Sequence, residues 1–449
     1  MEQNEARTAE LNVKAFFRKN MVGMIVAAMM AMLGIVVDGI ITSRFLGTQC
    51  MAAYGLVTPV TNLTMVFSGV FSGGAQVLCA HLVGAGKNDD ARRVFSMCMT
   101  ATVVLSACLM TVFFIWRQDI CVMLGAAGEN AALLPLSSDY LLGVLFSVPS
   151  VIMLFEFNGL MRLDGDPNRI IVAVTVMTVM DIGGDLLNVL VIHGGMLGMG
   201  LSTSISYAAA LAIMMLHFRR KDIIFRFRLK GIRFKDLRDI VVIGSSSAVG
   251  SGAAMLRNRV LNGIMLRLSI AVAATAALSV LNTILNITSS IMGGMGLTCS
   301  MITGLVIGMK NEDMKKELRK VTVKNALILA VILFAILFPF APFIVALFEG
   351  PGGTEMTALA ARGLRIYSIG IFLYALNTAY INHAQGMRRM VVSNTFCFLE
   401  NFVFIVIPAL ALAGAIGADA VWAAFPISEG LTFAAIILFR FVSKRGGRS

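Results

Sequence analysis

Twelve long apolar runs limit what this chain can fold into. Each run is long enough to cross the roughly 30 Å hydrocarbon layer of a bilayer as a helix. Backbone groups inside lipid must be satisfied within a helix or a closed barrel, and these runs lack the period-2 alternation of barrel strands. We therefore predict an all-α polytopic membrane protein. Its twelve transmembrane helices are expected at about residues 20–43, 54–83, 94–116, 139–161, 170–192, 197–217, 240–266, 270–307, 324–348, 364–384, 391–413 and 419–441.

The charges are few, and their distribution is typical of a membrane protein. Charged residues make up 14% of the chain, against about 25% in soluble domains. The net charge of +12 comes from lysines and arginines that gather in every second connection, which is the positive-inside pattern. This pattern argues against a nucleic-acid partner. It predicts a protein of the bacterial cytoplasmic (inner) membrane, with both termini and the 219–239 connection in the cytoplasm.

An internal repeat divides the chain into two halves. Residues 87–90 match 310–313, Gly165 matches Gly386, and Asp38 matches Asn262, at offsets of 223, 221 and 224. Both halves start on the inside, so the repeats are parallel, and transporters place their sites at or beside such repeat interfaces. We predict two pseudo-symmetric six-helix lobes, an N-lobe at 1–218 and a C-lobe at 240–449, joined by a basic cytoplasmic linker at 219–239.

The linker mixes Phe and Ile with lysines and arginines. Such a segment can lie on the inner leaflet and attract anionic lipid, so membrane lipids are expected partners. A plain solvated connection between the two halves is the alternative.

Asp38 is the only charged side chain in the apolar run from Asn20 to Ser43. A carboxylate at that depth costs on the order of 2.5 kcal/mol or more. An acid inside a membrane therefore indicates an ion site or a proton relay. The alternative is a structural Asp held by neighbouring hydroxyls or amides. Its repeat counterpart Asn262 can coordinate a cation or donate a hydrogen bond but cannot titrate near neutral pH.

The sequence contains no motif for a metal, a cofactor or ATP hydrolysis. The four histidines are scattered without metal-ligand spacing, and no GxxxxGK[ST] motif occurs. We therefore predict a protein that is not an enzyme, binds no metal other than a coupling ion, and needs no cofactor. Transport would be driven by an ion or substrate gradient, and we expect the chain to act as a monomer.

Three stretches resemble the multidrug and toxic compound extrusion (MATE) family of transporters. They are DGIITSRFLGTQCMAAYGLVTP at 38–59, GGAQVLCAHLVGAGKNDDARR at 73–93 and GLMRLDGDPNR at 159–169. The resemblance implies a cation-coupled antiporter that exports small amphiphilic, often cationic organic compounds by alternating access. Related flippases for polysaccharides and lipid-linked precursors share the fold, so a flippase is the alternative. A membrane-embedded enzyme or receptor is a more remote one.

The resemblance also implies a cation site in the first half. Asp38 and Asp185 match the acids of the family, and Asp181 stands where the family usually has Asn. The i, i+4 spacing puts Asp181 and Asp185 on one helix face. Two carboxylates so close should not both ionise without a counter-cation, which favours H⁺ over Na⁺ as the coupling ion, although Na⁺ can also bind there. Asn188 and Thr203 are candidates for additional ligands.

Other intramembrane charges allow two interpretations each. We expect Glu156 to snorkel or to contact a cytoplasmic gate, and substrate binding is the alternative. Glu400 is expected to neutralise Arg257 or Arg259 as a structural bridge, or else to contact substrate in the second half. Glu429, in the last span, stays ambiguous.

The first helix departs from the family at Gly23, where family members often carry a kinking Pro. Glycine permits a bend without forcing one.

Overall fold

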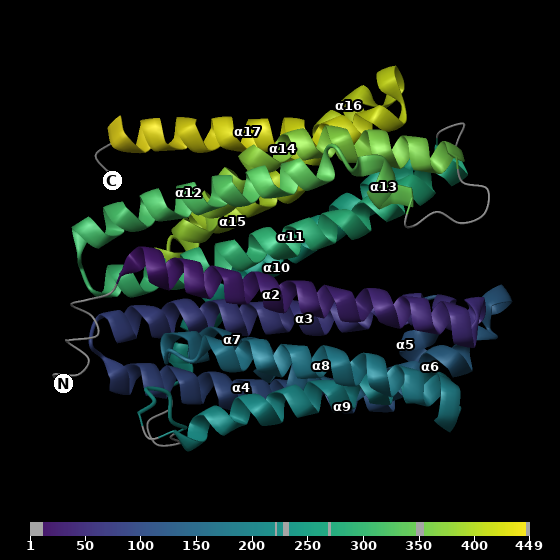
Figure 1. The fold of residues 1–449 in the computed structure, drawn as a ribbon, viewed down its shortest axis with the longest axis horizontal. Helices are drawn as coiled ribbons and strands as arrows, with labels where there is room; N and C mark the ends of the chain where they lie inside the picture. The colour runs from purple at the N-terminus through teal and green to yellow at the C-terminus, as the bar shows by residue number, and fades with distance from the viewer. Residues whose placement is uncertain (1–11, 221, 228–232, 268–270, 347–353, 446–449) are drawn as a thin grey trace. The chain divides into compact units, whose positions relative to one another are not determined.

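The computed structural model describes residues 12–220, 222–227, 233–267, 271–346 and 354–445. The prediction of an all-α membrane protein is confirmed. These described residues contain no strand. They contain eleven helices long and apolar enough to cross a membrane, or twelve when one bent pair counts as a span (Figure 1).

The first half of the chain contributes the N-terminal spans and their short connecting turns. In chain order its elements are α2 (Val13–Ile41), η1 (Thr42–Leu46), α3 (Thr48–Gly84), α4 (Asn88–Ile115), α5 (Arg117–Met123), η2 (Gly128–Asn130), α6 (Leu133–Leu145), α7 (Val148–Leu163), α8 (Pro167–Leu187), η3 (Asn188–Ile192), α9 (Gly195–Met215) and η4 (Leu216–Arg219).

The second half contributes the remaining spans. Its elements are α10 (Phe234–Met265), α11 (Ala271–Gly308), α12 (Glu312–Leu337), α13 (Ala341–Ala346), α14 (Thr354–Gly386), α15 (Met390–Phe398), η5 (Leu399–Val403), α16 (Phe404–Ile416) and α17 (Ala418–Arg445). The segments η1, η3 and η5 are π-helical turns, which often occur at functional sites.

The fourth span is the bent pair. The sequence predicts one helix at about 139–161, whereas α6 and α7 meet at an angle of 46°. Pro149 lies in the first turn of α7, where its missing N–H leaves no hydrogen bond unmade. The bend is therefore built into the sequence at Ser147–Pro149.

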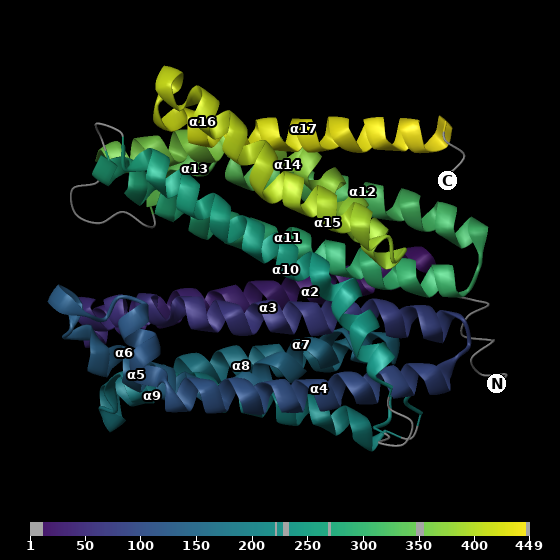
Figure 2. The same cartoon turned by 180° about the vertical axis from the view of Figure 1, so that it is seen from behind.

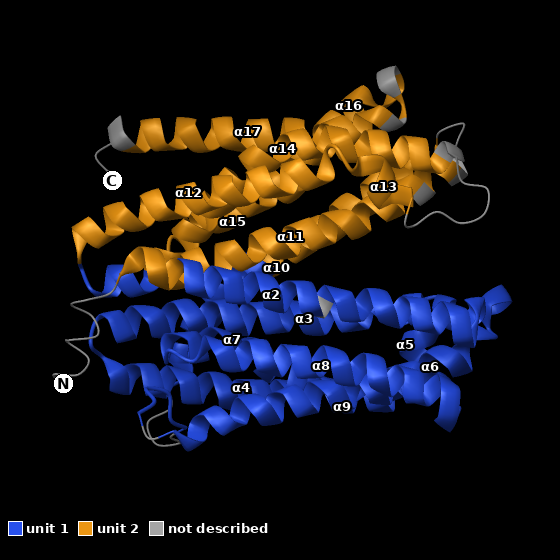
Figure 3. Cartoon of the chain, viewed as in Figure 1, with its two compact units in different colours: residues 1–11, 18–247, 304–310 blue, residues 12–17, 248–303, 311–449 orange. Residues whose placement is uncertain are grey.

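Two compact units make up the described chain (Figure 3). Unit 1 comprises residues 18–247 and 304–310, and unit 2 comprises residues 12–17, 248–303 and 311–445. The division by contact falls inside α10 and α11, whereas the predicted lobes divide the chain by its repeat.

Unit 1 is a bundle in which α9 packs on α6 and α8, and α3 packs on α4, α6 and α7 (Figures 1 and 2). Its core is an apolar cluster contributed by several of these helices. Buried members of this core include Ile41, Val57, Phe113, Tyr140, Leu141, Ile152 and Met199.

Glycines allow α10 and α11 to approach α3 closely within unit 1. A Cβ on Gly74 would lie 2.0 Å from the carbonyl oxygen of Ile240, and one on Gly244 would lie 1.9 Å from that of Val70. A Cβ on Gly308 would lie 2.2 Å from the His81 carbonyl oxygen. Only glycine fits where backbones approach this closely. These contacts explain why the first turns of α10 and the last turn of α11 belong to unit 1.

Part of the central linker is fixed to unit 1. The Asp164 carboxylate accepts hydrogen bonds from the backbone N–H groups of Ile224 (2.7 Å) and Phe225 (3.4 Å), and His217 Nε2 lies 3.1 Å from it. Ile223, Ile224 and Phe225 are buried. The expectation that the linker lies on the membrane leaflet is therefore wrong for 223–225, because their apolar side chains are buried in the protein. Residues 221 and 228–232 of the linker lie outside the described residues.

Asp166 also contacts His217, the residue beside Asp164 just before the linker. It accepts from Arg169 Nε at 3.0 Å, and its Oδ2 lies 3.0 Å from His217 Nδ1. Burial opposes ionisation, but the hydrogen bond with His217 and the charge of Arg169 hold the pKa of Asp166 below its ordinary value. Asp166 therefore stays ionised at neutral pH, and its interactions persist there.

In unit 2, α14 packs on α12, α15 and α17, and these helices lie side by side in both ribbon views (Figures 1 and 2). Tyr367 and Phe425 stack between α14 and α17 with ring centroids 4.0 Å apart. The side chain of Trp422 is buried beside Gly363, where an added Cβ would lie 2.9 Å from the indole.

Candidate functional site

Three acids of unit 1 come together inside the membrane-spanning bundle. Asp38 lies in the last turn of α2, and Asp181 and Asp185 lie one turn apart on α8; all three are buried. The carboxyl groups of Asp38 and Asp185 lie close enough to act on each other, and both Asp185 oxygens are buried without a hydrogen-bond partner. Two buried carboxyl groups this close repel each other when both are ionised, so a proton on one of them stabilises the pair.

Asp181 has a different environment from the other two acids. Its Oδ1 accepts a hydrogen bond from Ser206 Oγ at 3.1 Å, and the Thr203 hydroxyl also contacts it. Both carboxylate oxygens of Asp185 are buried without a hydrogen-bond partner, and the Ser202 hydroxyl is the hydroxyl group beside them. Hydroxyl donors stabilise the ionised form of a carboxyl group. Asp181 is therefore the acid best suited to be ionised, whereas Asp38 and Asp185 form a pair of neighbouring carboxyl groups.

These acids border a cavity of about 220 Å³ in unit 1. Its wall combines aromatic rings, hydroxyl groups and two carboxyl groups, and no Lys, Arg or His lines it. The rings of Tyr54 and Tyr140 lie 5.2 Å apart. Aromatic faces beside carboxylates suit an organic cation, which gains from both. Lining residues that carry this chemistry are Asp38, Asp181, Tyr54, Tyr140, Tyr207, Phe113, Met65, Met177, Thr58, Thr61, Asn62 and Thr203.

The two predicted additional ligands, Thr203 and Asn188, differ in whether they reach the cavity. Thr203 lines the cavity and contacts Asp181. Asn188 is committed to the turn after α8, because its Nδ2 donates to the Gly195 carbonyl at 2.9 Å and its Oδ1 accepts from Gly194 N–H at 3.0 Å. Asn188 is therefore a structural cap in this conformation. Asn262, the repeat counterpart of Asp38, is exposed on α10.

Glu400 does not form the bridge that we expected. Among the described residues, neither Arg257 nor Arg259 lies within ion-pair distance of it. Glu400 sits in the π-helical turn η5, and its carboxyl group contacts that of Glu429 from α17. The pair is buried, and Asn377 Nδ2 donates to Glu429 Oε2 at 2.8 Å. Unit 2 thus contains a second carboxyl–carboxyl contact.

The two arginines lie elsewhere in unit 2. Arg257 lines a cavity of about 60 Å³ together with Tyr367, Trp422 and Phe425, and its Nε lies 3.3 Å from Asn258 Oδ1. Arg259 is exposed. Arg257 acts on Glu400 and Glu429 only at longer range, through its charge.

Glu156 is a buried side chain on α7 that holds helices together inside unit 1. Thr102 and Cys98 of α4 donate to its Oε1, the thiol at 3.4 Å. The side chain is 1% exposed and lines none of the cavities described here. The snorkelling or gate role of Glu156 stays a prediction. In this conformation its contacts are with Thr102 and Cys98.

Sequence reasoning missed the role of Glu429. A usable signal existed, because Glu429 lies 223 residues after Ser206, the same offset that relates residues 87–90 to 310–313. Ser206 is the residue that donates to Asp181. The repeat therefore places a carboxyl group in unit 2 where unit 1 has a hydroxyl group, and this comparison would have directed attention to α17.

Comparison with known proteins finds one family model and several bacterial relatives that match this chain. A family model, MatE, matches residues 23–187 and 248–407. The "Multidrug export protein MepA" of Staphylococcus haemolyticus (strain JCSC1435) is 26% identical over 199 residues, which is 43% of this chain and 43% of the relative. The chain thus aligns with less than half the length of MepA. The "Probable multidrug resistance protein YoeA" of Bacillus subtilis (strain 168) is 23% identical over 345 residues, 73% of this chain and 72% of the relative.

Solved structures share the fold over nearly the whole chain. A structure described as "Outward-facing conformation of a multidrug resistance MATE family transporter of the MOP superfamily" has a TM-score of 0.90 at 19% identity, covering 99% of this chain and 98% of the other. A structure of a MOP superfamily transporter from Pyrococcus furiosus, described as having reverse polarity of its binding pocket, has a TM-score of 0.89 at 19% identity and covers 97% of this chain and 98% of the other.

Proposed function

The chain belongs to the MatE family, and from this premise we propose that it exports small amphiphilic, often cationic organic compounds in exchange for a coupling cation. The observation that carries the proposal is the cavity of unit 1. Asp38 and Asp181 stand in a wall that is otherwise aromatic, hydroxylic or apolar and that has no cation. Such a wall favours a ligand with positive charge and apolar surface.

We propose H⁺ as the coupling ion. The support is the burial of the Asp38 and Asp185 carboxyl groups beside each other, which a proton on one of them stabilises. Na⁺ prefers several oxygen ligands around one point, and Asn188 is already occupied in capping a turn. Na⁺ is the alternative ion for the same three acids.

Exchange follows from competition for the same carboxyl groups. A singly charged organic cation bound beside Asp38 and Asp181 replaces the one positive charge of the proton held by Asp38 and Asp185, and the returning proton displaces the organic cation. A substrate can be released outside and a proton inside if the cavity opens to one side of the membrane at a time. Alternating access therefore couples the two flows without any cofactor.

We place the protein in the bacterial cytoplasmic membrane as a monomer, because unit 1 builds the whole cavity from one chain. The MatE family consists of transporters, so an enzyme or receptor is no longer an alternative. A flippase for an anionic lipid-linked precursor is disfavoured, because an anionic head group would need cations in the wall of this cavity.

Efflux from proteoliposomes that contain the purified protein tests the proposal. Accumulation of a fluorescent organic cation is followed under a H⁺ gradient and, separately, under a Na⁺ gradient. We expect uphill transport with the H⁺ gradient. Asp38→Asn should reduce it to the level of empty liposomes and leave expression and thermal stability near those of the parent, because Asn keeps the size of the side chain but cannot exchange a proton.

Asp119→Asn is the matched control, since Asp119 is an exposed acid on α5, away from the cavity. It should transport like the parent. Uphill efflux by Asp38→Asn at the parental rate would exclude the assigned site, and transport driven by Na⁺ alone would exclude H⁺ coupling.

A further inference from the structure

A second, basic cavity occupies unit 2 and has no part in the proposed export site. It has a volume of about 670 Å³ and lies between α12, α14 and α17. Its polar lining comes from one end of each helix: the first turns of α12 and the last turns of α14 and α17. Arg389, which directly precedes α15, joins them. All these helix ends lie on the side of the membrane that carries the basic connections.

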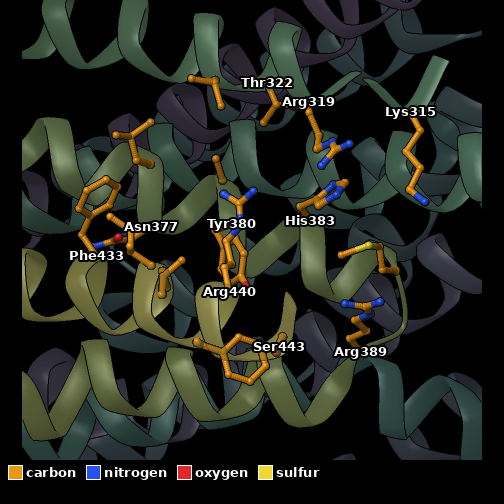
Figure 4. A pocket seen from close by; sticks show the side chains of 17 residues that line it. Lys315, Arg319, Thr322, Asn377, Tyr380, His383, Arg389, Phe433, Arg440 and Ser443 are labelled. Atoms are coloured by element: carbon orange, nitrogen blue, oxygen red, sulfur yellow. The ribbon is translucent and has the colours of Figure 1, made fainter. Parts of the chain in front are cut away.

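Four cations surround this basic pocket: Lys315, Arg319, Arg389 and Arg440 (Figure 4). All four are close enough to act on the ring of His383 through their charge. The residues that line the pocket include no Asp or Glu. The positive charge is therefore concentrated at one place and is not offset within the pocket.

Protein partners account for little of this charge. Lys315 pairs with Glu312 at 3.3 Å. Among the residues that the structure describes, Arg319, Arg389 and Arg440 form no ion pair. Arginines scattered on a solvated surface would be unremarkable, but three unpaired guanidinium groups from three elements here border one cavity. A guanidinium fork matches the oxygens of a phosphate group.

The rest of the basic pocket is amphiphilic. Tyr380, Thr322 and Ser443 offer hydroxyl groups beside the cations, and His383 Nδ1 lies 3.0 Å from Thr303 Oγ1. The rest of its wall is largely apolar and includes Leu376, Phe433, Ile436, Ile437 and Phe439. A ligand that fits both parts has an anionic head and a hydrocarbon portion.

An apolar groove leaves the basic pocket along α12. Arg319, Val323 and Arg440 line both the groove and the pocket, so the two are continuous. The groove continues past Lys324 over apolar side chains that point away from the unit. These are Leu327, Ile328, Val331 and Ile332. Cations at one end and four aliphatic residues beyond them match the order of groups in a phospholipid.

We propose that the basic pocket binds one anionic glycerophospholipid from the cytoplasmic leaflet. Its phosphate lies among Arg319, Arg389 and Arg440, and one acyl chain lies in the groove along α12. The groove is the reason to choose a lipid over a free phosphate ion, because it is continuous with the pocket and gives an acyl chain an apolar path that a soluble anion cannot use. The site is distinct from the export cavity, which lies entirely in unit 1.

Native mass spectrometry of the full chain in detergent tests this proposal, with phosphatidylglycerol as the probe and phosphatidylcholine as the neutral comparison. We expect the parent to retain one phosphatidylglycerol and to bind phosphatidylcholine at least about tenfold more weakly. Arg319→Gln/Arg389→Gln/Arg440→Gln should weaken phosphatidylglycerol binding at least about tenfold.

Two further variants separate a site from general attraction. Arg18→Gln/Arg233→Gln/Arg238→Gln removes the same charge from exposed arginines outside the pocket and should bind like the parent. Val323→Trp keeps the charge but fills the junction of pocket and groove, and it should also lose the lipid. Equal binding by the pocket variant and the parent, or equal losses in both triple variants, would overturn the proposal. Displacement of the lipid by excess inorganic phosphate, with Val323→Trp binding like the parent, would assign the pocket to a free phosphate instead.

Discussion

A carboxyl group buried without a cation needs either hydrogen-bond donors or a proton. Asp181 has the hydroxyl groups of Ser206 and Thr203. Asp38 and Asp185 lie beside each other, as do Glu400 and Glu429 in unit 2, where Glu429 also accepts a hydrogen bond from Asn377. Replacing one residue therefore removes a hydroxyl donor in one case and a neighbouring carboxyl group in the other. Single substitutions can distinguish these two effects.

The contact between Glu400 and Glu429 predicts the behaviour of Glu400 variants. Glu400→Gln keeps a hydrogen-bond donor opposite Glu429 and should leave thermal stability in detergent within about 1 kcal/mol of the parent. Glu400→Ala removes the donor and leaves a void, so it should destabilise by about 2–4 kcal/mol.

Arg257 provides the comparison with the bridge that the sequence suggested. If Glu400 neutralised Arg257, adding Arg257→Gln to Glu400→Ala would restore stability, because it removes the lone charge. The contact with Glu429 predicts no such recovery. Recovery of the parental melting temperature in the double variant would therefore reinstate the bridge.

All three acids of unit 1 could be predicted from the sequence, whereas in unit 2 only Glu400 was predicted and its neighbour Glu429 was missed. Asp38, Asp181 and Asp185 follow from one charge in an apolar run and an i, i+4 spacing, both of which are properties of single helices. Glu400 was singled out for the same reason. Its partner depends on how α17 is rotated against η5, and no pattern within one helix contains that rotation. The long arginine side chains were therefore the more obvious, and wrong, partners.

At the scale of elements, small residues decide which helices can touch. The approach of α10 to α3 depends on Gly74 and Gly244, whose missing Cβ atoms leave room for the opposing carbonyl groups. Backbone is much less able to move aside than the end of a flexible side chain. The contact therefore tolerates substitution less than burial alone would suggest.

Gly74→Ala should destabilise unit 1 by about 1–3 kcal/mol or more, because its Cβ would lie 2.0 Å from the Ile240 carbonyl oxygen. Thermal unfolding in detergent measures the effect. Gly55→Ala on the same helix is the matched control, since an added Cβ there meets nothing within 4 Å. That variant should be neutral or slightly stabilising, as alanine is the better helix former. Similar losses in both variants would point to a general intolerance of α3 instead.

Element boundaries were mostly predictable, and the exceptions have physical reasons. The spans follow from hydropathy because lipid imposes one simple requirement on them. The linker segment 223–225 looked like a leaflet-binding stretch because it is apolar and lies among cations. Its burial depends on Asp164, a distant residue that pairs with its backbone N–H groups. A hydrogen bond to a backbone N–H group does not depend on the side chains of that segment. The composition of the segment therefore could not predict its burial.

At the scale of the whole molecule, charge distribution should set the orientation in the membrane. The alternate connections rich in Lys and Arg belong in the cytoplasm. We therefore expect green fluorescent protein to fluoresce when fused after Ser449 and alkaline phosphatase to be inactive there. Alkaline phosphatase inserted after Glu129, in the short turn η2, should be active. The opposite pattern of activities would reverse the assigned orientation.

The placement of the two tryptophans makes the protein its own optical reporter. Trp116 is exposed at the end of α4 in unit 1, whereas Trp422 is buried in unit 2 beside Arg257 in the small cavity. Replacing Trp116 by Phe leaves a single, buried emitter beside Arg257, whose charge acts on Glu400 and Glu429. Changes in its intensity then report on events inside unit 2 while the export cavity of unit 1 stays spectroscopically silent. A native fluorophore thus distinguishes the two halves of the chain without any label.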